Sequence, residues 1–187
     1  MALDSSPSPD PFSTILRGIA DARVDDAAAA RARTQWMARH AEEGGTLTGA
    51  LVDLAERRAV AQLRVRGGIE VSGTPIAVGA DVVAMRTRAG VSLVRLDRVQ
   101  TIRTDAAHVP AAGRAAHTDG PTLADTLREM AADHRVVRVC TDDGGAVRGE
   151  LRAVGADVVT LRVGDPPTGT VLVSLDAVTM ADVPNER

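Results

Sequence analysis

The spacing of apolar residues changes twice along the chain from a helical to an extended pattern. In two regions apolar side chains recur at intervals of three and four residues, which predicts an amphipathic helix in each. These side chains are Leu47, Leu51 and Leu54 in the first region and Leu123, Leu127 and Met130 in the second. Thr122 and Asp125 also form a capping box at the second helix, whereas Gly49 replaces the acid in the first. We therefore expect two helices, of which the first has the weaker start.

Five short valine-rich segments, bounded by Gly or Asp, follow each helical region and are typical of β-strands. In the first region they span residues 59–66, 69–78, 81–88, 91–97 and 98–103. The second segment contains Gly73 and Pro75, which indicate a bend or a bulge. Because a five-stranded sheet with one sharply bent strand can close on itself, we expect a small barrel after each helix.

The two helix-and-strand regions are similar to each other in sequence. At an offset of 76 residues, positions 44–86 align with 120–162 without a gap, and 17 of the 43 aligned positions are identical. Both copies contain AVGADVV, and the extra residues in GDPPTG shift the later alignment to an offset of 79. Self-similarity over this length indicates a tandem duplication.

The remaining segments differ in composition from the two repeated units. A helix start at Asp10-Pro11 precedes an Ala- and Arg-rich stretch, and a segment rich in Ala, Gly and Pro separates the units. The predicted organisation is a disordered N-terminus at 1–9, a helical extension at 10–45, unit 1 at 46–103, a flexible linker at 104–121, unit 2 at 122–183 and a tail at 184–187.

Composition limits the kinds of site that the chain can build. Cys140 is the only cysteine, which rules out a disulfide or a cysteine-rich metal site within one chain. No segment approaches the roughly 18 apolar residues of a membrane span, so we expect a cytoplasmic protein without membrane contact. The four histidines lack metal-ligand spacing and are expected at the surface, without any cofactor. They are His40, His108, His117 and His134.

Glycines and apolar residues recur around the second predicted strand of each unit. They are Gly68, Val71, Gly73 and Val78 in unit 1, and Gly144, Val147, Gly149, Leu151 and Val154 in unit 2. With a preceding helix and a bent second strand, this pattern resembles the first signature of the Sm-like family, which includes the Hfq-type RNA chaperones. It is also similar to small helix-plus-barrel proteins of high-GC bacteria. The resemblance implies a mainly β fold of two tandem units, each an α-helix followed by a bent five-stranded Sm-like or SH3-like barrel, after an N-terminal helical segment.

The pore residues with which Sm-like rings bind RNA are not matched here. Gly79 and Gly155 stand where the resemblance would place an Asp, and Val83 and Val159 where it would place an Asn. Aromatic platforms for stacking bases are also missing from both units, since the only Phe and Trp, Phe12 and Trp36, precede them and the chain has no Tyr. RNA binding through a pore or by stacking is therefore not implied.

Charge distinguishes the two units. Residues 46–103 contain nine arginines and five acidic residues, a net charge of +4, whereas residues 121–182 contain six arginines and ten acidic residues, a net charge of −4. Three interpretations remain open: solvated surfaces, docking of the basic on the acidic unit within or between chains, and phosphate contacts with nucleic acid. The candidate binding residues are Arg64, Arg66, Arg86, Arg88, Arg95 and Arg98.

A Gly-Ala-Asp sequence recurs between two predicted strands of each unit. Gly79 and Asp81 in unit 1, like Gly155 and Asp157 in unit 2, favour a turn whose carboxylate bonds nearby backbone N–H groups. The alternative places both carboxylates at a shared pore or ligand edge.

Chemical motifs of an enzyme are missing: the sequence has no Gly-rich phosphate loop, no nucleophile with a placed base and no metal-ligand cluster. We therefore predict a non-enzymatic assembly or protein-interaction module that pairs through sheet edges, with self-association or another protein as the partner. A ring of three chains is one form it could take. The alternative is a weak, sequence-nonspecific RNA-binding module.

Overall fold

The computed structural model describes residues 45–105, 119–164, 166 and 169–185. The contacts divide the chain into Met1–Glu43 and Gly44–Arg187, and all described residues belong to the second of these units. The predicted N-terminus, most of the helical extension and most of the linker lie outside the described residues, as do Phe12 and Trp36. We call residues 45–105 the first half and residues 119–185 the second half.

Each half consists of one helix followed by five strands. The elements of the first half are α2 (Leu47–Glu56), β1 (Ala61–Val65), β2 (Glu70–Val78), β3 (Val82–Arg86), β4 (Gly90–Arg95) and β5 (Val99–Thr104). Those of the second half are α3 (Leu123–Ala132), β6 (Val136–Thr141), β7 (Ala146–Val154), β8 (Val158–Val163), β9 (Gly169–Ser174) and β10 (Val178–Pro184). Short 3-10 turns, η1 (Arg66–Gly68), η2 (Leu96–Arg98) and η3 (Leu175–Ala177), lie before β2, β5 and β10. The helix and the five strands that the sequence predicts within each repeated unit are confirmed.

Both helices begin at a threonine cap. The Thr122 hydroxyl accepts a hydrogen bond from the Asp125 N–H, and the Asp125 carboxylate accepts one from the Thr122 N–H, which completes the capping box of α3. In α2, Thr46 accepts a bond from Gly49 N–H, and the first turn holds no acidic residue. The first helix therefore has the simpler cap.

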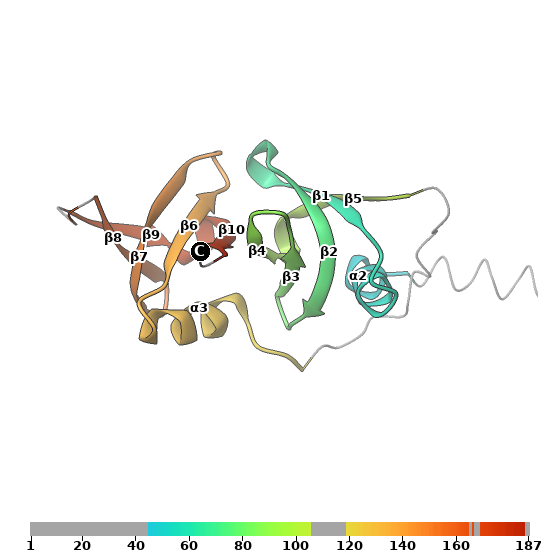
Figure 1. Cartoon of the computed structure of the whole chain (residues 1–187), viewed down its shortest axis with the longest axis horizontal. Helices are drawn as coiled ribbons and strands as arrows, with labels where there is room; N and C mark the ends of the chain where they lie inside the picture. The colour runs from blue at the N-terminus through green and yellow to red at the C-terminus, as the bar shows by residue number, and fades with distance from the viewer. Residues whose placement is uncertain (1–44, 106–118, 165, 167–168, 186–187) are drawn as a thin grey trace, which may run out of the picture. The chain divides into compact units, whose positions relative to one another are not determined.

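The ten strands form one open antiparallel sheet, so the prediction of two tandem closed barrels is wrong. The strand order is β5-β1-β2-β3-β4-β10-β6-β7-β8-β9. Strands β4 and β10 lie side by side and join the halves, as Figure 1 shows. The last strand of the second half thus pairs with a strand of the first half, and β5 and β9 form the two ends of the sheet.

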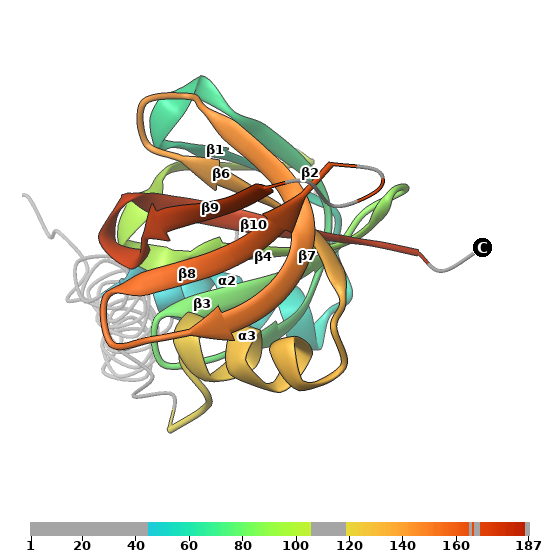
Figure 2. The ribbon, with the colours of Figure 1, turned by 90° about the vertical axis from the view of Figure 1, so that its left-hand side faces the viewer.

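Corresponding strands of the two halves pair in the same register. Ala61 faces Gly73 between β1 and β2, and the aligned Val137 faces Gly149 between β6 and β7. Both halves have a bulge on the second strand, between Pro75 and Ala77 in β2 and between Leu151 and Ala153 in β7. These bulges account for the predicted bend. Each helix packs against the bent strand of its own half: α2 packs on β2, and α3 packs on β7, as Figure 2 shows.

The buried side chains form two clusters, and each cluster receives residues from both halves. The first-half cluster is built on Leu51, Leu54 and Leu63 and includes Cys140 and Met180 from the second half. The second-half cluster contains Leu123, Leu127, Leu151 and Leu161, together with Val82 and Leu93 from the first half. Because each cluster contains side chains from both halves, the hydrophobic packing of one half depends on the other.

Loss of the Thr122 hydroxyl should weaken the second helix. Thr122→Ala removes the acceptor for the Asp125 N–H, and such a cap is worth about 1 kcal/mol of stability. We expect the free energy of unfolding, measured by urea titration with far-UV circular dichroism, to fall by about that amount. Thr122→Ser keeps the hydroxyl and should retain most of the stability. Equal losses in the two variants would assign the effect to the methyl group instead.

Candidate assembly interface

The junction between β4 and β10 is the strand pairing that joins the two halves. Its register places Val94 opposite Met180, Leu93 opposite Ala181 and Ser92 opposite Asp182. Successive side chains of a strand point to opposite faces. Met180 accordingly enters the first-half cluster, whereas Ala181 and Val183 enter the second-half cluster. Both faces of β10 are therefore buried, and Ala181 is 0% exposed.

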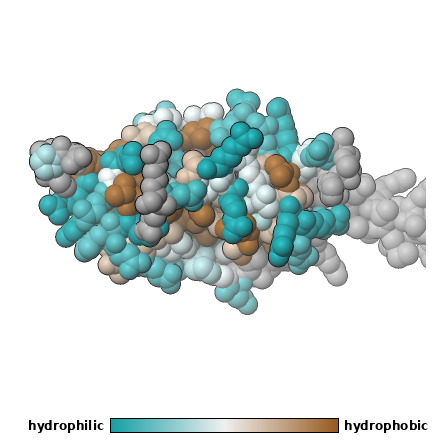
Figure 3. Space-filling model, viewed as in Figure 1, coloured by the Kyte–Doolittle hydropathy of each residue, from teal (hydrophilic) through white to brown (hydrophobic). Residues whose placement is uncertain are grey.

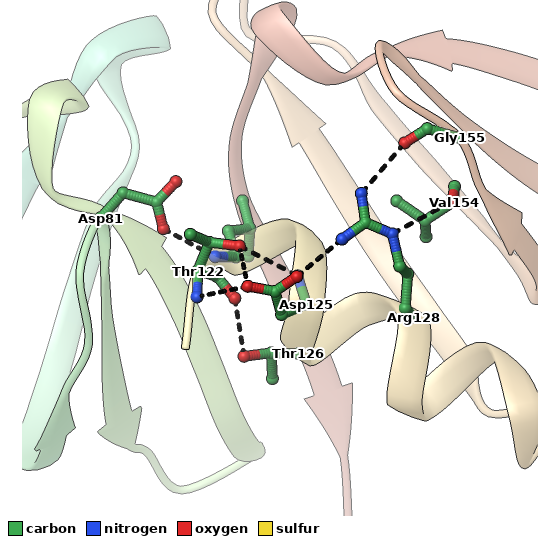
Figure 4. A network of polar contacts seen from close by, with 8 residues as sticks. Asp81, Thr122, Asp125, Thr126, Arg128, Val154 and Gly155 are labelled. Carbon is green, nitrogen blue, oxygen red and sulfur yellow. Dashed lines mark hydrogen bonds and ion pairs between the residues drawn. The ribbon is translucent and has the colours of Figure 1, made fainter. Parts of the chain in front are cut away.

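The turn between β2 and β3 contacts the start of α3 at one end of the junction. Asp81 Oδ1 accepts a hydrogen bond of 2.6 Å from the Leu123 N–H, at the N-terminus of α3 (Figure 4). The Ala80 N–H donates to the Pro121 carbonyl over 3.2 Å. A carboxylate at this position is stabilised by the unpaired N–H groups and the dipole of the helix. The first half thus caps the helix of the second half.

Two arginines of the first half bind backbone carbonyls of the second half at the same end. Arg95 Nη1 donates to the Leu175 carbonyl over 3.0 Å, and Arg98 Nη2 donates to the Asp176 carbonyl over 2.6 Å. Asp97 orients Arg95 through two hydrogen bonds, of 3.1 and 3.0 Å. Both arginine side chains are 15% exposed. The guanidinium groups of both arginines are therefore engaged in contacts within the junction and have little exposure to solvent.

The middle of the junction holds a polar cluster at the rim of a hollow. Ser92 Oγ donates to Asp182 Oδ1 over 2.7 Å, and Arg138 Nη1 lies 3.5 Å from Asp182 Oδ2. The hollow has a volume of about 270 Å³ and is also lined by Arg148 and Pro184. The Ser92 hydroxyl and the Asp182 carboxylate therefore satisfy each other's hydrogen-bonding groups beside the hollow.

The two end strands, β5 and β9, each have one neighbour in the described sheet. Strand β9 aligns with β4 in the sequence repeat, and β5 aligns with β10. Leu172 on β9 is 66% exposed, whereas its counterpart Leu93 on β4 is 4% exposed because it packs in the second-half cluster. Strand β9 thus presents, without a partner strand in the described structure, the apolar residue that β4 buries.

Exposed apolar side chains are scattered over the rest of the described surface. On the face seen in Figure 3, brown apolar residues lie in separate patches among teal polar ones. The large apolar residues that are most exposed in the described structure are Val60, Ile76, Val136 and Leu172. Of these, Leu172 lies on a terminal strand of the sheet.

The structure separates the six arginines that the charge pattern singled out. Arg64 lies on β1 opposite Glu70, and Arg66 follows it in η1. Arg86 ends β3, and Arg88 lies in the β3–β4 turn; all four side chains are exposed. Arg95 and Arg98 lie at the junction instead. The predicted basic face is therefore divided between an exposed group and a group that binds backbone carbonyls.

The two Gly-Ala-Asp turns have the same backbone and different surroundings. Gly79 N–H donates to the Val82 carbonyl over 2.7 Å, and Gly155 N–H donates to the Val158 carbonyl over 2.8 Å. Asp81 is half-buried against α3, whereas Asp157 is exposed. The carboxylate of Asp81 bonds an N–H that lies 42 residues along the chain, rather than one in its own turn.

Hydrogen bonding and burial shift the pKa values of several titratable groups among the described residues. The capping bonds from Thr122 lower the pKa of Asp125, and hydrogen bonding to Arg152 lowers the pKa of Glu150. Burial raises the pKa of the Cys140 thiol, which reduces its nucleophilicity. His134, the one described histidine, is exposed near Glu150. Within residues 45–105 and 119–185, apart from the undescribed positions, no group of His, Cys, Asp and Glu could hold a metal ion.

Sequence reasoning singled out Arg95, Arg98 and Asp81 but missed the strand pairing of the junction itself. Strand β10 contains the run Val178 to Val183, in which apolar residues do not alternate strictly with polar ones. Such a run indicates a strand that is buried on both faces. This pattern predicts that β10 is buried on both faces, but it does not identify β4 as the strand that pairs with it.

Comparisons with known proteins identify no relative of this chain. No family model, curated protein or solved structure matches it. Among the described helices, none is long and apolar enough to cross a membrane.

Proposed function

We propose that this chain is a non-enzymatic assembly module that self-associates by adding strands at the ends of its sheet. The observation that carries the proposal is Leu172, which is 66% exposed on a terminal strand although its counterpart Leu93 is 4% exposed in the junction. A terminal strand with free backbone groups and an exposed apolar side chain is a pairing surface for another strand.

Features of the described sheet support a protein partner over RNA. Two of the six candidate arginines bind carbonyl groups at the junction and have little exposure left for phosphates. Neither half contains an aromatic residue on which a base could stack. Weak, sequence-nonspecific RNA binding through Arg64, Arg66, Arg86 and Arg88 remains the alternative prediction, and it requires a steep loss of affinity with salt.

Self-association should depend on the apolar side chain of β9. We expect the full chain to show a weight-average mass above that of the monomer in sedimentation experiments, and the mass should rise with concentration. Leu172→Lys places a charge on the pairing surface and should shift the protein to the monomer at each concentration.

Val136→Lys is the matched control, because Val136 is 43% exposed on β6, a strand inside the sheet. This variant should associate like the unmodified protein. A monomeric unmodified protein at the highest attainable concentration would contradict the proposal. An equal loss of association in the two variants would also contradict the proposal, because association would then depend on exposed apolar residues in general and not on β9.

A further inference from the structure

We infer that the partner is a second copy of this chain, joined head to tail: β9 of one copy pairs with β5 of the next, and Asp157 caps α2 of the next copy. This inference rests on the proposed self-association and names its geometry. The template is the junction inside the chain, where β4 pairs with β10 and Asp81 caps α3.

The sequence repeat supplies the register of the intermolecular pairing. In the junction, Leu93 faces Ala181 and Val94 faces Met180. At an offset of 79, Leu93 and Val94 correspond to Leu172 and Val173, while Ala181 and Met180 correspond to Ile102 and Thr101. The same geometry therefore places Leu172 opposite Ile102 and Val173 opposite Thr101. Leu172 and Ile102 would form an apolar cross-strand pair, which removes the exposed leucine from water.

The second Gly-Ala-Asp turn supplies an independent contact of the same kind. Asp81 Oδ1 lies 2.6 Å from the Leu123 N–H, and Ala80 N–H donates to Pro121. The aligned residues are Asp157 for Asp81 and Leu47 for Leu123. Ala156 and Asp157 are both exposed, although their turn has the same backbone bonds as the first turn. In a head-to-tail pair the Asp157 carboxylate would therefore reach the N–H groups at the start of α2.

The opposite net charges of the two halves also favour head-to-tail pairing. Residues 46–103 have a net charge of +4 and residues 121–182 a net charge of −4. A head-to-tail contact brings opposite charges together, whereas β9 with β9 or β5 with β5 would bring like charges together. The contact is heterologous, so it leaves one free β9 and one free β5 until a ring closes or a filament grows.

The differences between β5 and β10 make this contact weaker than the one inside the chain. Arg64 and Thr101 correspond to Cys140 on β6 and Met180 on β10, which are both buried in the first-half cluster. Ser174 and Ala177 stand where Arg95 and Arg98 bind carbonyl groups across the junction. The intermolecular contact therefore loses apolar burial and two charge-assisted hydrogen bonds, and its association is reversible and dependent on concentration.

Two variants that block opposite ends of the sheet test the direction of pairing. Leu172→Lys blocks β9, and Thr101→Asp blocks β5 with a charge at an exposed position. Each variant alone should be monomeric in sedimentation, with an unchanged circular dichroism spectrum. An equimolar mixture should form a one-to-one dimer, because one intact β9 and one intact β5 remain.

The outcomes separate this inference from the proposed function. If the unmodified chain never associates, self-association itself fails. If it associates and Thr101→Asp still forms a dimer alone, the contact joins two β9 strands; if Leu172→Lys does so, it does not use β9. Either result overturns the head-to-tail geometry while self-association stands.

The Asp157 contact is tested within the mixed dimer. Asp157→Asn, introduced into the Thr101→Asp chain, should weaken the dimer by roughly three- to tenfold, since it removes a charged hydrogen-bond acceptor. Glu129→Gln in the same chain is the control, because Glu129 is an exposed acid on α3 and its loss changes the net charge equally. Equal affinities for the two variants would overturn the cap on α2 while leaving the strand pairing in place.

Discussion

Expressed without the first half, residues 106–187 are expected to stay unfolded at room temperature. The second-half cluster would lose Val82 and Leu93, and Cys140 and Met180 would lose the cluster in which they are buried. Strand β10, whose two faces are buried, would become an end strand with apolar side chains exposed to water. A domain of about 60 residues is already marginal in the surface that it buries, so these losses should prevent folding.

Circular dichroism and amide dispersion in a nitrogen–proton correlation spectrum measure this outcome directly. Adding residues 1–105 as a separate chain should restore the folded spectrum, because the halves are joined by strand pairing and shared cores. A cooperative urea transition of residues 106–187 alone would contradict the prediction and would indicate two independent domains.

Ala181→Asp should have the second large effect, on the stability of the whole described sheet. Ala181 is 0% exposed and lies between Leu93 of β4 and Val139 of β6. A carboxylate there would be buried without a hydrogen-bond partner, and it would separate the two strands that flank β10. We expect the free energy of unfolding to fall by roughly 4 kcal/mol or more.

The matched control for this variant is Ile102→Asp. Ile102 aligns with Ala181 in the repeat but lies on β5, at an end of the sheet, and is partly exposed. Urea titration should therefore show a clearly smaller loss for Ile102→Asp. Similar losses at the two positions would mean that the junction contributes no more to stability than an end strand.

Local elements could be predicted because their causes lie within a few residues of each other. The capping box of Thr122 and Asp125 joins residues three positions apart, and the structure contains both of its hydrogen bonds. The bend of the second strand follows from Gly73 and Pro75 in the sequence, and β2 has its bulge directly after Pro75. Strand positions follow from valine-rich runs between turn residues.

The closed barrels were wrongly predicted because alternation identifies the buried face of a strand and leaves its neighbour undetermined. A five-stranded sheet closed on itself and a ten-stranded sheet shared by two halves place the same side chains toward a core. The choice of β4 as the partner of β10 depends on contacts between residues about 90 positions apart, such as Ser92 with Asp182.

The residues of the candidate site could be singled out from the sequence in part, but their contacts could not be predicted. The charge asymmetry left solvated surfaces, docking of the halves and phosphate contacts open, and the repeated turn singled out Asp81 and Asp157. The roles of these residues required the fold: Asp81 bonds the Leu123 N–H, and Arg95 bonds the Leu175 carbonyl. Both contacts depend on how the first half lies against the second, which no local pattern records.

The sequence by itself determined two similar units, their helices and strands, the caps, the bends and the opposite charges of the halves. Each of these depends on spacing, propensity or composition, which act over short stretches of chain. Only the tertiary structure decided that β10 pairs with β4, that the two cores exchange residues and that Leu172 stays exposed at an end of the sheet. The reason is that backbone hydrogen bonds between strands are chemically alike, so the pairing is selected by the burial of the whole sheet.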